Sequence, residues 1–368
     1  MQHLQSAVKE RYRSALSGGH LVFSPTHLAV IHAGGVPFQL RYCPALSKKP
    51  QAPPTAQPAN KPNPFLNPSK DLLVAQIPNV IPTHNIIINK FPVIPHHFIL
   101  STIVFKPQTD LLEGQDLGVA YSCLQEWEAS AGATIGLGRP SLFAFFNSGE
   151  HSGASQPHRH IQFLPIEDMA PDQENDGWSL LADDIVPASG IPSRGEFHSL
   201  LTPEATEPSQ TKSDQPVITS HPNLPFTHFA SPISPNPTPS DLHHLYISLY
   251  NRAASAVQAY AEANPNDDPL KPTPSNNDPT ATISYNLALT TKTMVLCPRR
   301  RGHVTVSVKQ TSNIETPQPL GPIELNGTVL AGTFLVRKKE EWDILCSDAQ
   351  EQALFELLKA IGIPRNPK

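Results

Sequence analysis

The chain has 368 residues with 27 basic and 32 acidic side chains, and its formal charge of −5 excludes a generally basic nucleic-acid coat. No apolar run reaches the about 18 residues that a membrane-spanning helix requires, and the first ten residues lack the apolar core of a signal peptide. The four cysteines are far apart and form no CxxC pair. We therefore expect reduced thiols that pack in the interior of a protein of the cytoplasm or the nucleus.

Prolines number 41 and concentrate in three polar, turn-rich groups that lack an apolar period. The groups cover 44–68, 202–216 and 264–279, and each pattern is typical of a linker or an insertion. We therefore expect an N-terminal part at 1–201, a proline-rich linker at 202–216 and a C-terminal part at 217–368. Within the C-terminal part, residues 264–280 are predicted to form a disordered insertion.

Between these groups, the spacing of apolar residues predicts a mixed α+β fold. Three segments have the period of a helix, and in the last of them Ser347 is expected to cap the first turn and Gln350 to complete a capping box. Seven short segments rich in β-branched or aromatic residues are predicted strands of an antiparallel sheet. In chain order, the predicted elements are strands Asn85–Lys90 and Phe98–Phe105, helix Leu111–Trp127, strands Leu142–Asn147 and His160–Leu164, helix Leu242–Tyr260, strands Ser284–Thr290, Met294–Pro298 and Thr328–Val336, and helix Ser347–Ile361.

The most informative window, residues 145–165, is predicted to run from a strand through a loop of small residues to a second strand. On the second strand, His158, His160 and Gln162 share one face, so two imidazoles and an amide project together. Ile161 and Phe163 alternate with them and are expected to face the core. The preceding loop, which includes Ser148-Gly149 and Ser152-Gly153-Ala154-Ser155, has little bulk and many backbone N–H groups. Such a loop can approach a phosphate chain closely and donate hydrogen bonds to it.

These residue types suit phosphoryl or nucleotidyl transfer. A neutral imidazole is a good nucleophile near pH 7, and its attack on phosphorus gives a phosphoramidate that divides one difficult transfer into two easier steps. A neighbouring amide such as Gln162 can hydrogen-bond the phosphoryl oxygens without titrating. Two histidines at this spacing also fit a metal site, although no Cys or acidic residue stands nearby at ligand spacing. A third interpretation is a pair of ordinary surface histidines on an edge strand.

A family resemblance is carried by the same residues. His158-Arg159-His160-Ile161-Gln162 resembles the His-x-His-x-Gln signature of the transferase branch of the histidine-triad superfamily. The wider string, from Asn147-Ser148-Gly149 through Gly153-Ala154-Ser155-Gln156-Pro157, is similar to the diadenosine tetraphosphate phosphorylases, the ATP adenylyltransferases of fungi. Other blocks that resemble this family are Lys61–Phe65, Asn89–Phe98, Tyr285–Arg299 and Leu330–Arg337. The resemblance covers most of the chain outside the proline-rich insertions.

The resemblance implies a histidine-triad-type antiparallel sheet with flanking helices at 1–201 and a second, degenerate half at 217–368. It implies phosphorolysis of diadenosine tetraphosphate to ATP and ADP, and release of ADP from adenosine 5'-phosphosulfate and phosphate. By this resemblance His160 is the nucleophile that holds AMP as adenylyl-histidine, Gln162 contacts the phosphoryl oxygens, and His158 is a second catalytic histidine. The residues that it assigns to substrate binding are Lys61, Asn89, Lys90, Asn147, Gly153, Ala154, Ser155, Gln156, Asn286, Leu330, Ala331, Gly332 and Arg337.

Several of these residues also have a plain structural interpretation. Lys61 and Lys90 offer cationic contacts to phosphate, but the first also fits a flexible linker and the second a solvated hairpin end. Asn147 and Asn286 also fit turn-forming or structural roles. Arg337 stands where the family has a lysine, so the charge is kept but the reach and the hydrogen-bond geometry are not.

Two other functions stay open at this point. A related uridylyltransferase that acts on hexose 1-phosphates shares the His-x-His-x-Gln logic, and a nucleotide-binding sensor would bind without turnover. Simple hydrolysis to AMP is disfavoured, because Gln162 stands where histidine-triad hydrolases carry a third histidine. The expected partners are small nucleotides and phosphate, without nucleic acid or membrane. Mg²⁺ is expected to accompany the polyphosphate, with no protein-only metal site. The run Arg299-Arg300-Arg301 is interpreted as a solvated turn.

Overall fold

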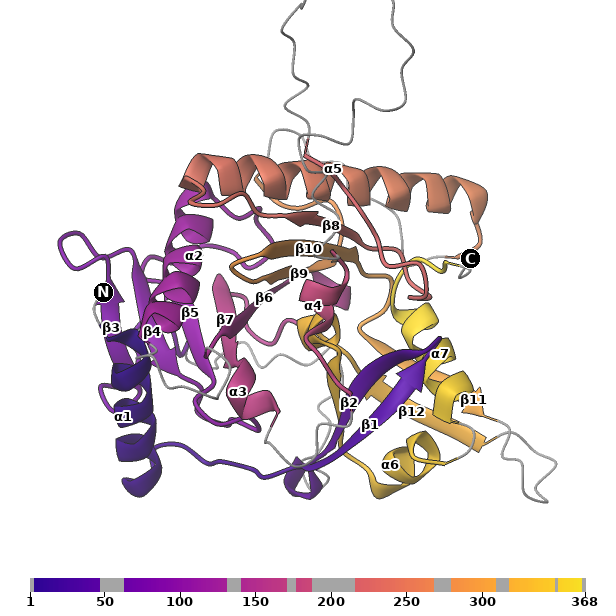
Figure 1. Cartoon of the computed structure of the whole chain (residues 1–368), viewed down its shortest axis with the longest axis horizontal. Coiled ribbons are helices and arrows are strands. Elements are labelled where there is room, and N and C mark those ends of the chain that lie inside the picture. The colour runs from indigo at the N-terminus through magenta and orange to yellow at the C-terminus, as the bar shows by residue number, and fades with distance from the viewer. Residues whose placement is uncertain are drawn as a thin grey trace, which may run out of the picture.

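The computed structural model describes residues 3–46, 63–130, 140–170, 177–186, 216–267, 279–308, 318–347 and 350–365. Its central feature is one antiparallel sheet of eight strands to which both parts of the chain contribute (Figure 1). The strands lie in the order β3 (Leu73–Ile77), β4 (His84–Ile88), β5 (Phe98–Thr102), β7 (His160–Pro165), β6 (Leu142–Ser148), β9 (Tyr285–Leu289), β10 (Thr293–Pro298) and β8 (Phe229–Pro232). The pairing of β6 with β9 joins the N-terminal strands to the C-terminal strands without a break.

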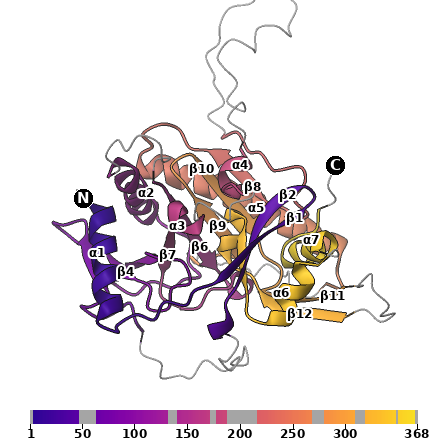
Figure 2. The same ribbon diagram turned by 60° about the horizontal axis from the view of Figure 1, so that its bottom comes forward.

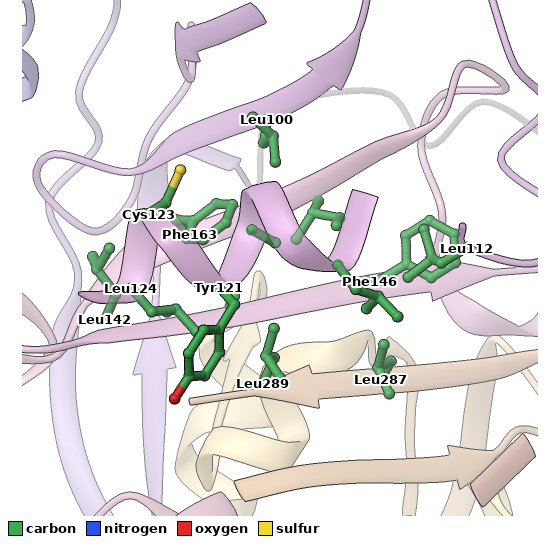
Figure 3. Packing of buried hydrophobic residues seen from close by; sticks show 14 of the residues in the cluster. Leu100, Leu112, Tyr121, Cys123, Leu124, Leu142, Phe146, Phe163, Leu287 and Leu289 are labelled. Atoms are coloured by element: carbon green, nitrogen blue, oxygen red, sulfur yellow. The ribbon is translucent and has the colours of Figure 1, made fainter. Parts of the chain in front are cut away.

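Alternation along the strands divides the apolar side chains between two cores. On β6, Leu142 and Phe146 face the first core, whereas Phe143 and Phe145 face the second. The first core is covered by α1 (Leu4–Ser17), α2 (Gly114–Ala129) and α5 (Pro239–Ala263). Figure 3 shows α2 over this face, with its apolar side chains above those of β5, β6, β7 and β9.

A smaller unit covers the opposite face of the C-terminal strands. The hairpin of β1 (His27–Ala33) and β2 (Val36–Tyr42) forms a three-stranded sheet with β13 (Thr333–Val336), which runs parallel to β2. A two-stranded sheet of β11 (His303–Val308) and β12 (Gln318–Glu324), together with α6 (Lys339–Leu345) and α7 (Gln350–Ile361), gathers beside this hairpin (Figure 2). An N-terminal hairpin is therefore built into the C-terminal part of the molecule.

The remaining elements are short. They are η1 (Pro44–Leu46), η2 (Glu150–Ser152), α3 (Ile166–Met169), α4 (Leu181–Asp184) and η6 (Gly327–Ala331). Within the described ranges, every helix is too short or too polar to cross a membrane.

The α+β fold class and the antiparallel sheet are confirmed, and Ile161 and Phe163 are buried as expected. The predicted strand Thr328–Val336 is wrong in its first half. The Asn326 carboxamide accepts the Thr328 N–H, which starts the tight helix η6, and Gly332 ends that helix with a positive φ of 70°. Strand β13 then begins at Thr333.

Two other predictions also need correction. A third, the cap at Ser347, stays a prediction: α7 is described from Gln350, residues 348–349 lie outside the described residues, and the Ser347 hydroxyl donates to the carbonyl of Ile344 at the end of α6. The arginine run is not a solvated turn throughout, because Arg299 is 1% exposed. Cys346 is exposed, although Cys43, Cys123 and Cys297 are buried as expected. The linker predicted at 202–216 falls almost wholly outside the described residues, as does most of the predicted insertion at 264–280.

Truncating Phe163 tests the packing of the first core. Its ring is fully buried and stacks on Phe98 with centroids 4.7 Å apart. We expect Phe163→Ala to lower the free energy of unfolding by about 3–5 kcal/mol, measured by urea denaturation, because it leaves a cavity in a packed interior. The control Val80→Ala removes a side chain that is 91% exposed and should change stability by less than about 0.5 kcal/mol. Equal effects of the two changes would contradict this account of the core.

Candidate active site

The site lies where two neighbouring strands of the large sheet part. β6 and β7 pair as far as Phe145 and Gln162, after which β6 continues against β9. The carboxamide of Gln108, buried in the loop after β5, fills the opening. Its Nε2 donates to the carbonyls of Asn147 and His160 at 2.8 and 3.2 Å, and its Oε1 accepts the His160 N–H at 2.7 Å. One side chain thus satisfies the backbone groups that the parted strands would leave unpaired.

The ring of His160 is fixed in one tautomer. Its Nδ1 lies 2.8 Å from the carbonyl oxygen of His158, which can only accept, so Nδ1 carries the proton and Nε2 keeps its lone pair. Burial lowers the pKa of His160 to about 4, so the ring is neutral near pH 7. The Phe65 ring packs against it with centroids 5.0 Å apart. The arrangement provides a neutral nitrogen nucleophile whose orientation is set by the backbone.

His158 is buried beside it and has both ring nitrogens engaged. Nδ1 lies 3.0 Å from Nδ2 of Asn63, and Nε2 lies 2.9 Å from the hydroxyl of Thr102. Burial lowers the pKa of this ring as well. Because both nitrogens have protein partners, His158 holds the loop and strand around the site, and its carbonyl orients the ring of His160.

The residue between the two histidines fixes the opposite side of the strand. Arg159 is 3% exposed, and its Nη1 donates to Asp116 at 2.8 Å and to Glu113 at 3.1 Å. These two carboxylates form the capping box at the start of α2. His84 contacts the other oxygen of Asp116 at 3.0 Å. The buried ion pairs therefore tie the histidine strand to α2 from behind.

A chain of hydrogen bonds determines which end of the Gln162 amide faces the site. The Phe91 N–H donates to Oδ1 of Asn89 at 3.0 Å, so Nδ2 of Asn89 is the donor to Nδ1 of His97 at 2.9 Å. Nε2 of His97 therefore carries the proton and donates to Oε1 of Gln162 at 3.1 Å. Burial lowers the pKa of His97 to about 4, which keeps this neutral tautomer. The NH₂ group of Gln162 is left as a donor, the sense required to bind phosphoryl oxygens.

Asn147 and Asn286 form a second amide pair on β6 and β9, where they are direct neighbours in the sheet. Nδ2 of Asn286 donates to Oδ1 of Asn147 at 2.8 Å and to the carbonyl of Ser152 at 2.9 Å. The Gly327 N–H also donates to Oδ1 of Asn147 at 2.9 Å. Nδ2 of Asn147 is buried and has no partner among the described residues.

A cleft of about 400 Å³ is lined by residues next to the partners of this pair: Gly153 follows Ser152, and Asn326 and Thr328 flank Gly327, whereas Asn147 and Asn286 are not among the lining residues. Gly153, Ala154 and Ser155 line one wall, and the opposite wall runs along β12 and the segment that follows it. Gly153 has a φ of 79°, and a Cβ there would lie 2.8 Å from Cβ of Asn326, so the loop needs glycine to come this close to the other wall. Arg337 also lines the cleft, where it donates to Glu324 at 2.6 Å. His158 and His160 are not among the described residues that line this cleft.

The remaining predicted residues are either absent from the lining of this cleft or outside the described residues. Lys90 is exposed and lies over the Phe91 ring at 5.7 Å, and Gln156 is half-buried. Leu330 and Ala331 are fully buried in the second core, and the Gly332 carbonyl accepts from the Trp178 indole at 2.9 Å. Lys61 lies outside the described residues. These contacts give Leu330 and Ala331 a packing role in the described structure.

Three residues of the site were not singled out from the sequence. His97 stands within a family-like block, and its period-two spacing from Ile99 on a strand was an available signal. Arg299 ends the family-like block Tyr285–Arg299, but it was interpreted as part of a solvated basic turn. Gln108 carries no such signal, because a loop glutamine is an ordinary surface residue in sequence. The roles of both residues depend on strands that are distant in the chain.

Two family models match this chain. Residues 1–176 match the model described as the Ap4A phosphorylase N-terminal domain, and residues 222–364 match the ATP adenylyltransferase C-terminal domain. The chain is 27% identical over 352 residues to diadenosine 5',5'''-P1,P4-tetraphosphate phosphorylase 2 of Saccharomyces cerevisiae, covering 94% of this chain and 91% of the relative. It is 28% identical over 309 residues to the protein APA1 of the same yeast, covering 81% and 80%.

Solved structures of yeast Ap4A phosphorylase Apa2 have the same fold. The structure of Apa2 itself superposes with a TM-score of 0.69 at 22% identity, covering 100% of this chain and 99% of Apa2. The complex of Apa2 with Ap4A gives 0.69 at 21% identity, with coverage of 100% and 99%. The complex with AMP gives 0.68 at 21% identity, with coverage of 100% and 98%.

The buried neutral histidines make stability depend on pH. His97, His160 and the distant His228 each have a pKa lowered to about 4 by burial, below the value near 6.5 of an unfolded histidine. Between these values the unfolded chain binds more protons, so stability is complete above about pH 6.5 and falls as the pH drops towards 4. We expect a loss of up to about 1.4 kcal/mol per pH unit for each imidazole, measured by urea unfolding at pH 7, 6 and 5.

The variant His160→Gln should reduce this pH slope by up to one proton. A slope that is the same in the wild type and in this variant would mean that the His160 imidazole is already protonated in the folded protein.

Proposed function

The chain belongs to the Ap4A phosphorylase and ATP adenylyltransferase family of nucleotidyltransferases, and on this premise we propose that it cleaves diadenosine tetraphosphate (Ap4A) with inorganic phosphate to ATP and ADP. The observation that carries the proposal is the His160 ring, which is neutral and held by the His158 carbonyl so that Nε2 keeps its lone pair. The named yeast relative is a tetraphosphate phosphorylase, and Apa2 has been crystallised with Ap4A and with AMP.

In the first step, Nε2 of His160 attacks the α-phosphorus. A P–N bond forms while the P–O bond to the departing group breaks, and ATP leaves with that oxygen on its terminal phosphate. The imidazolium that results keeps its Nδ1–H on the carbonyl of His158, which stabilises the positive charge. The NH₂ group of Gln162 donates to the phosphoryl oxygens, where negative charge increases in the transition state.

In the second step, an oxygen of inorganic phosphate attacks the same phosphorus. The P–N bond breaks, the electron pair returns to Nε2, and ADP leaves with the added phosphate as its β-phosphate. The same adenylyl-enzyme would form from adenosine 5'-phosphosulfate, with sulfate as the leaving group. A neutral amide at position 162 cannot exchange a proton, so Gln162 does not act as a general base towards water.

The polyphosphate is proposed to enter as its magnesium complex. The described residues hold no group of three or more His, Cys, Asp or Glu side chains placed to bind a metal. The ligands of the cation would then be phosphate oxygens and water, as is common for Mg²⁺ on nucleotides. Asn147 and the loop of Gly153, Ala154 and Ser155 would hold the phosphates through neutral N–H donors.

Mixing the protein with Ap4A in the absence of phosphate tests the nucleophile. We expect an acid-labile adduct one AMP heavier than the protein in intact-mass measurements, and its loss in His160→Ala, because no other neutral imidazole would occupy that position. The control His244→Ala changes an exposed histidine on α5 and should form the adduct at the wild-type level. Equal adduct in His160→Ala would assign the nucleophile to another residue.

Labelled phosphate distinguishes the competing functions. With ³²P-phosphate and Ap4A, the two-step route places all of the label in the β-phosphate of ADP and none in ATP or AMP. Unlabelled AMP would instead indicate hydrolysis. Uridylyl exchange with hexose 1-phosphates and no labelled ADP would support the uridylyltransferase. Tight binding of Ap4A with no product would support a sensor.

A further inference from the structure

Arg299 is connected to both walls of the cleft, to one directly and to the other through Asn286. Gly153, Ala154 and Ser155 line the first wall, and Leu325, Asn326 and Thr328 line the second. Nη1 of Arg299 donates to Oδ1 of Asn286, whose own amide holds the carbonyl of Ser152, the residue before the first wall. Nη2 donates to the carbonyl of Leu325 in the second wall at 2.8 Å. One guanidinium therefore connects the two walls.

The contacts of this guanidinium are all to neutral oxygens. Besides Asn286 and Leu325, it donates to the carbonyls of Arg301 at 2.9 Å and Ile361 at 3.3 Å. The side chain is 1% exposed, and no carboxylate among the described residues pairs with it. A buried cation without a counter-ion is unfavourable by several kcal/mol in general. Its neighbours Arg300 and Arg301 differ, because both contact Asp267.

The Arg299 contact is one of the bonds that fix the donor sense of two amides in series, together with the Ser152 carbonyl and the Gly327 N–H. A guanidinium can only donate, so Asn286 must present Oδ1 to it and Nδ2 to Asn147. Asn147 must then present Oδ1 to Asn286 and to the Gly327 N–H. The Nδ2 group of Asn147 is therefore left without a hydrogen-bond partner among the described residues. A buried amide N–H₂ without a partner costs about 1–3 kcal/mol, so this group calls for an acceptor that the described protein does not supply.

We propose that Arg299 is a positioning residue: through Asn286 it aims the amide donor of Asn147 at a phosphate oxygen of the bound nucleotide, and its unpaired charge favours that anion. The inference rests on the proposed function, because it needs a polyphosphate bound beside Asn147. It also changes the role of Asn286. Both ends of that carboxamide are occupied by protein partners, so Asn286 positions Asn147 and does not itself contact the nucleotide.

Placing this cation in the interior has a physical consequence for binding. Solvent ions screen exposed charges over about 8–10 Å at ordinary ionic strength, whereas a buried charge is screened much less. Lowered by burial, the pKa of Arg299 is still about 10, so the side chain is charged near pH 7. A single buried cation can thus attract a polyanion in a protein whose formal charge is −5.

The test measures the affinity of Ap4A by titration calorimetry in a His160→Asn background, so that the ligand is not consumed. Adding Arg299→Lys keeps a cation but removes the planar guanidinium that donates to both Asn286 and Leu325. We expect affinity to fall about 10- to 100-fold, the effect of losing hydrogen bonds to a charged group. The matched control Arg301→Lys makes the same chemical change at the exposed neighbour and should stay within about twofold of the parent.

A second variant covers the case in which Arg299→Lys does not fold. Asn286→Asp keeps an acceptor for Arg299, but removes the N–H donors to Asn147 and neutralises the guanidinium, so it should weaken binding by a similar factor. Combining the two substitutions should lose little more than the larger single loss, because both act through one chain of contacts. Circular dichroism and thermal unfolding check that each variant is folded.

The outcomes separate this inference from the proposed function. If the parent does not bind Ap4A at all, the proposed function is wrong. If the parent binds, and folded Arg299→Lys and Asn286→Asp bind within twofold of Arg301→Lys, the positioning role is wrong. Failure of both variants to fold would also overturn it, because Arg299 would then be required for folding itself.

Discussion

The site depends on the separation of β6 from β7 beyond Phe145 and Gln162. The side-chain amide of Gln108 stabilises this opening by bonding the backbone groups that the separated strands leave unpaired. A sheet that opens in its middle exposes backbone N–H and C=O groups that must be satisfied. Gln108 satisfies them with both ends of its carboxamide, and the two strands then present His160 and Asn147 across the opening. The helices that cover the first core hold these strands in place. They do so by apolar packing and by the ion pairs of Arg159 with α2.

The groups that characterise this site are neutral side chains, and each is oriented by hydrogen bonds from other residues of the fold. His97 and Asn89 orient the amide of Gln162, and Asn286 and Arg299 orient the amide of Asn147. The carbonyl of His158 orients the ring of His160. Each chain ends on a group whose donor or acceptor sense is fixed before a ligand arrives. Preorganised dipoles of this kind stabilise developing charge without having to reorganise during the reaction. In the function proposed above, such neutral donors would let a chain with a negative formal charge bind phosphate.

Sequence reasoning succeeded where function depends on local order. The alternation of His158, His160 and Gln162 placed the latter two on one strand face, and the glycine at 153 lies where two walls approach each other. It failed where a residue takes its role from a remote segment. Thr328 and Leu330 are β-like in composition, but the Asn326 cap and the contact of Gly327 with Asn147 turn this stretch into a tight helix. The basic run at 299–301 contains two buried residues, Arg299 and Arg300, that composition could not distinguish from Arg301.

The sequence alone determined the fold class, the residue types that alternate on the histidine strand and the family resemblance, because all three follow from the order and spacing of neighbouring residues. Only the tertiary structure decided which nitrogen of each histidine carries the proton, which end of each amide faces the site, and that Gln108, His97 and Arg299 belong to it. Those properties arise from hydrogen bonds between segments up to about 180 residues apart, such as Gly327 to Asn147. Burial then fixes them, because a donor or a charge removed from water must find its partner within the fold.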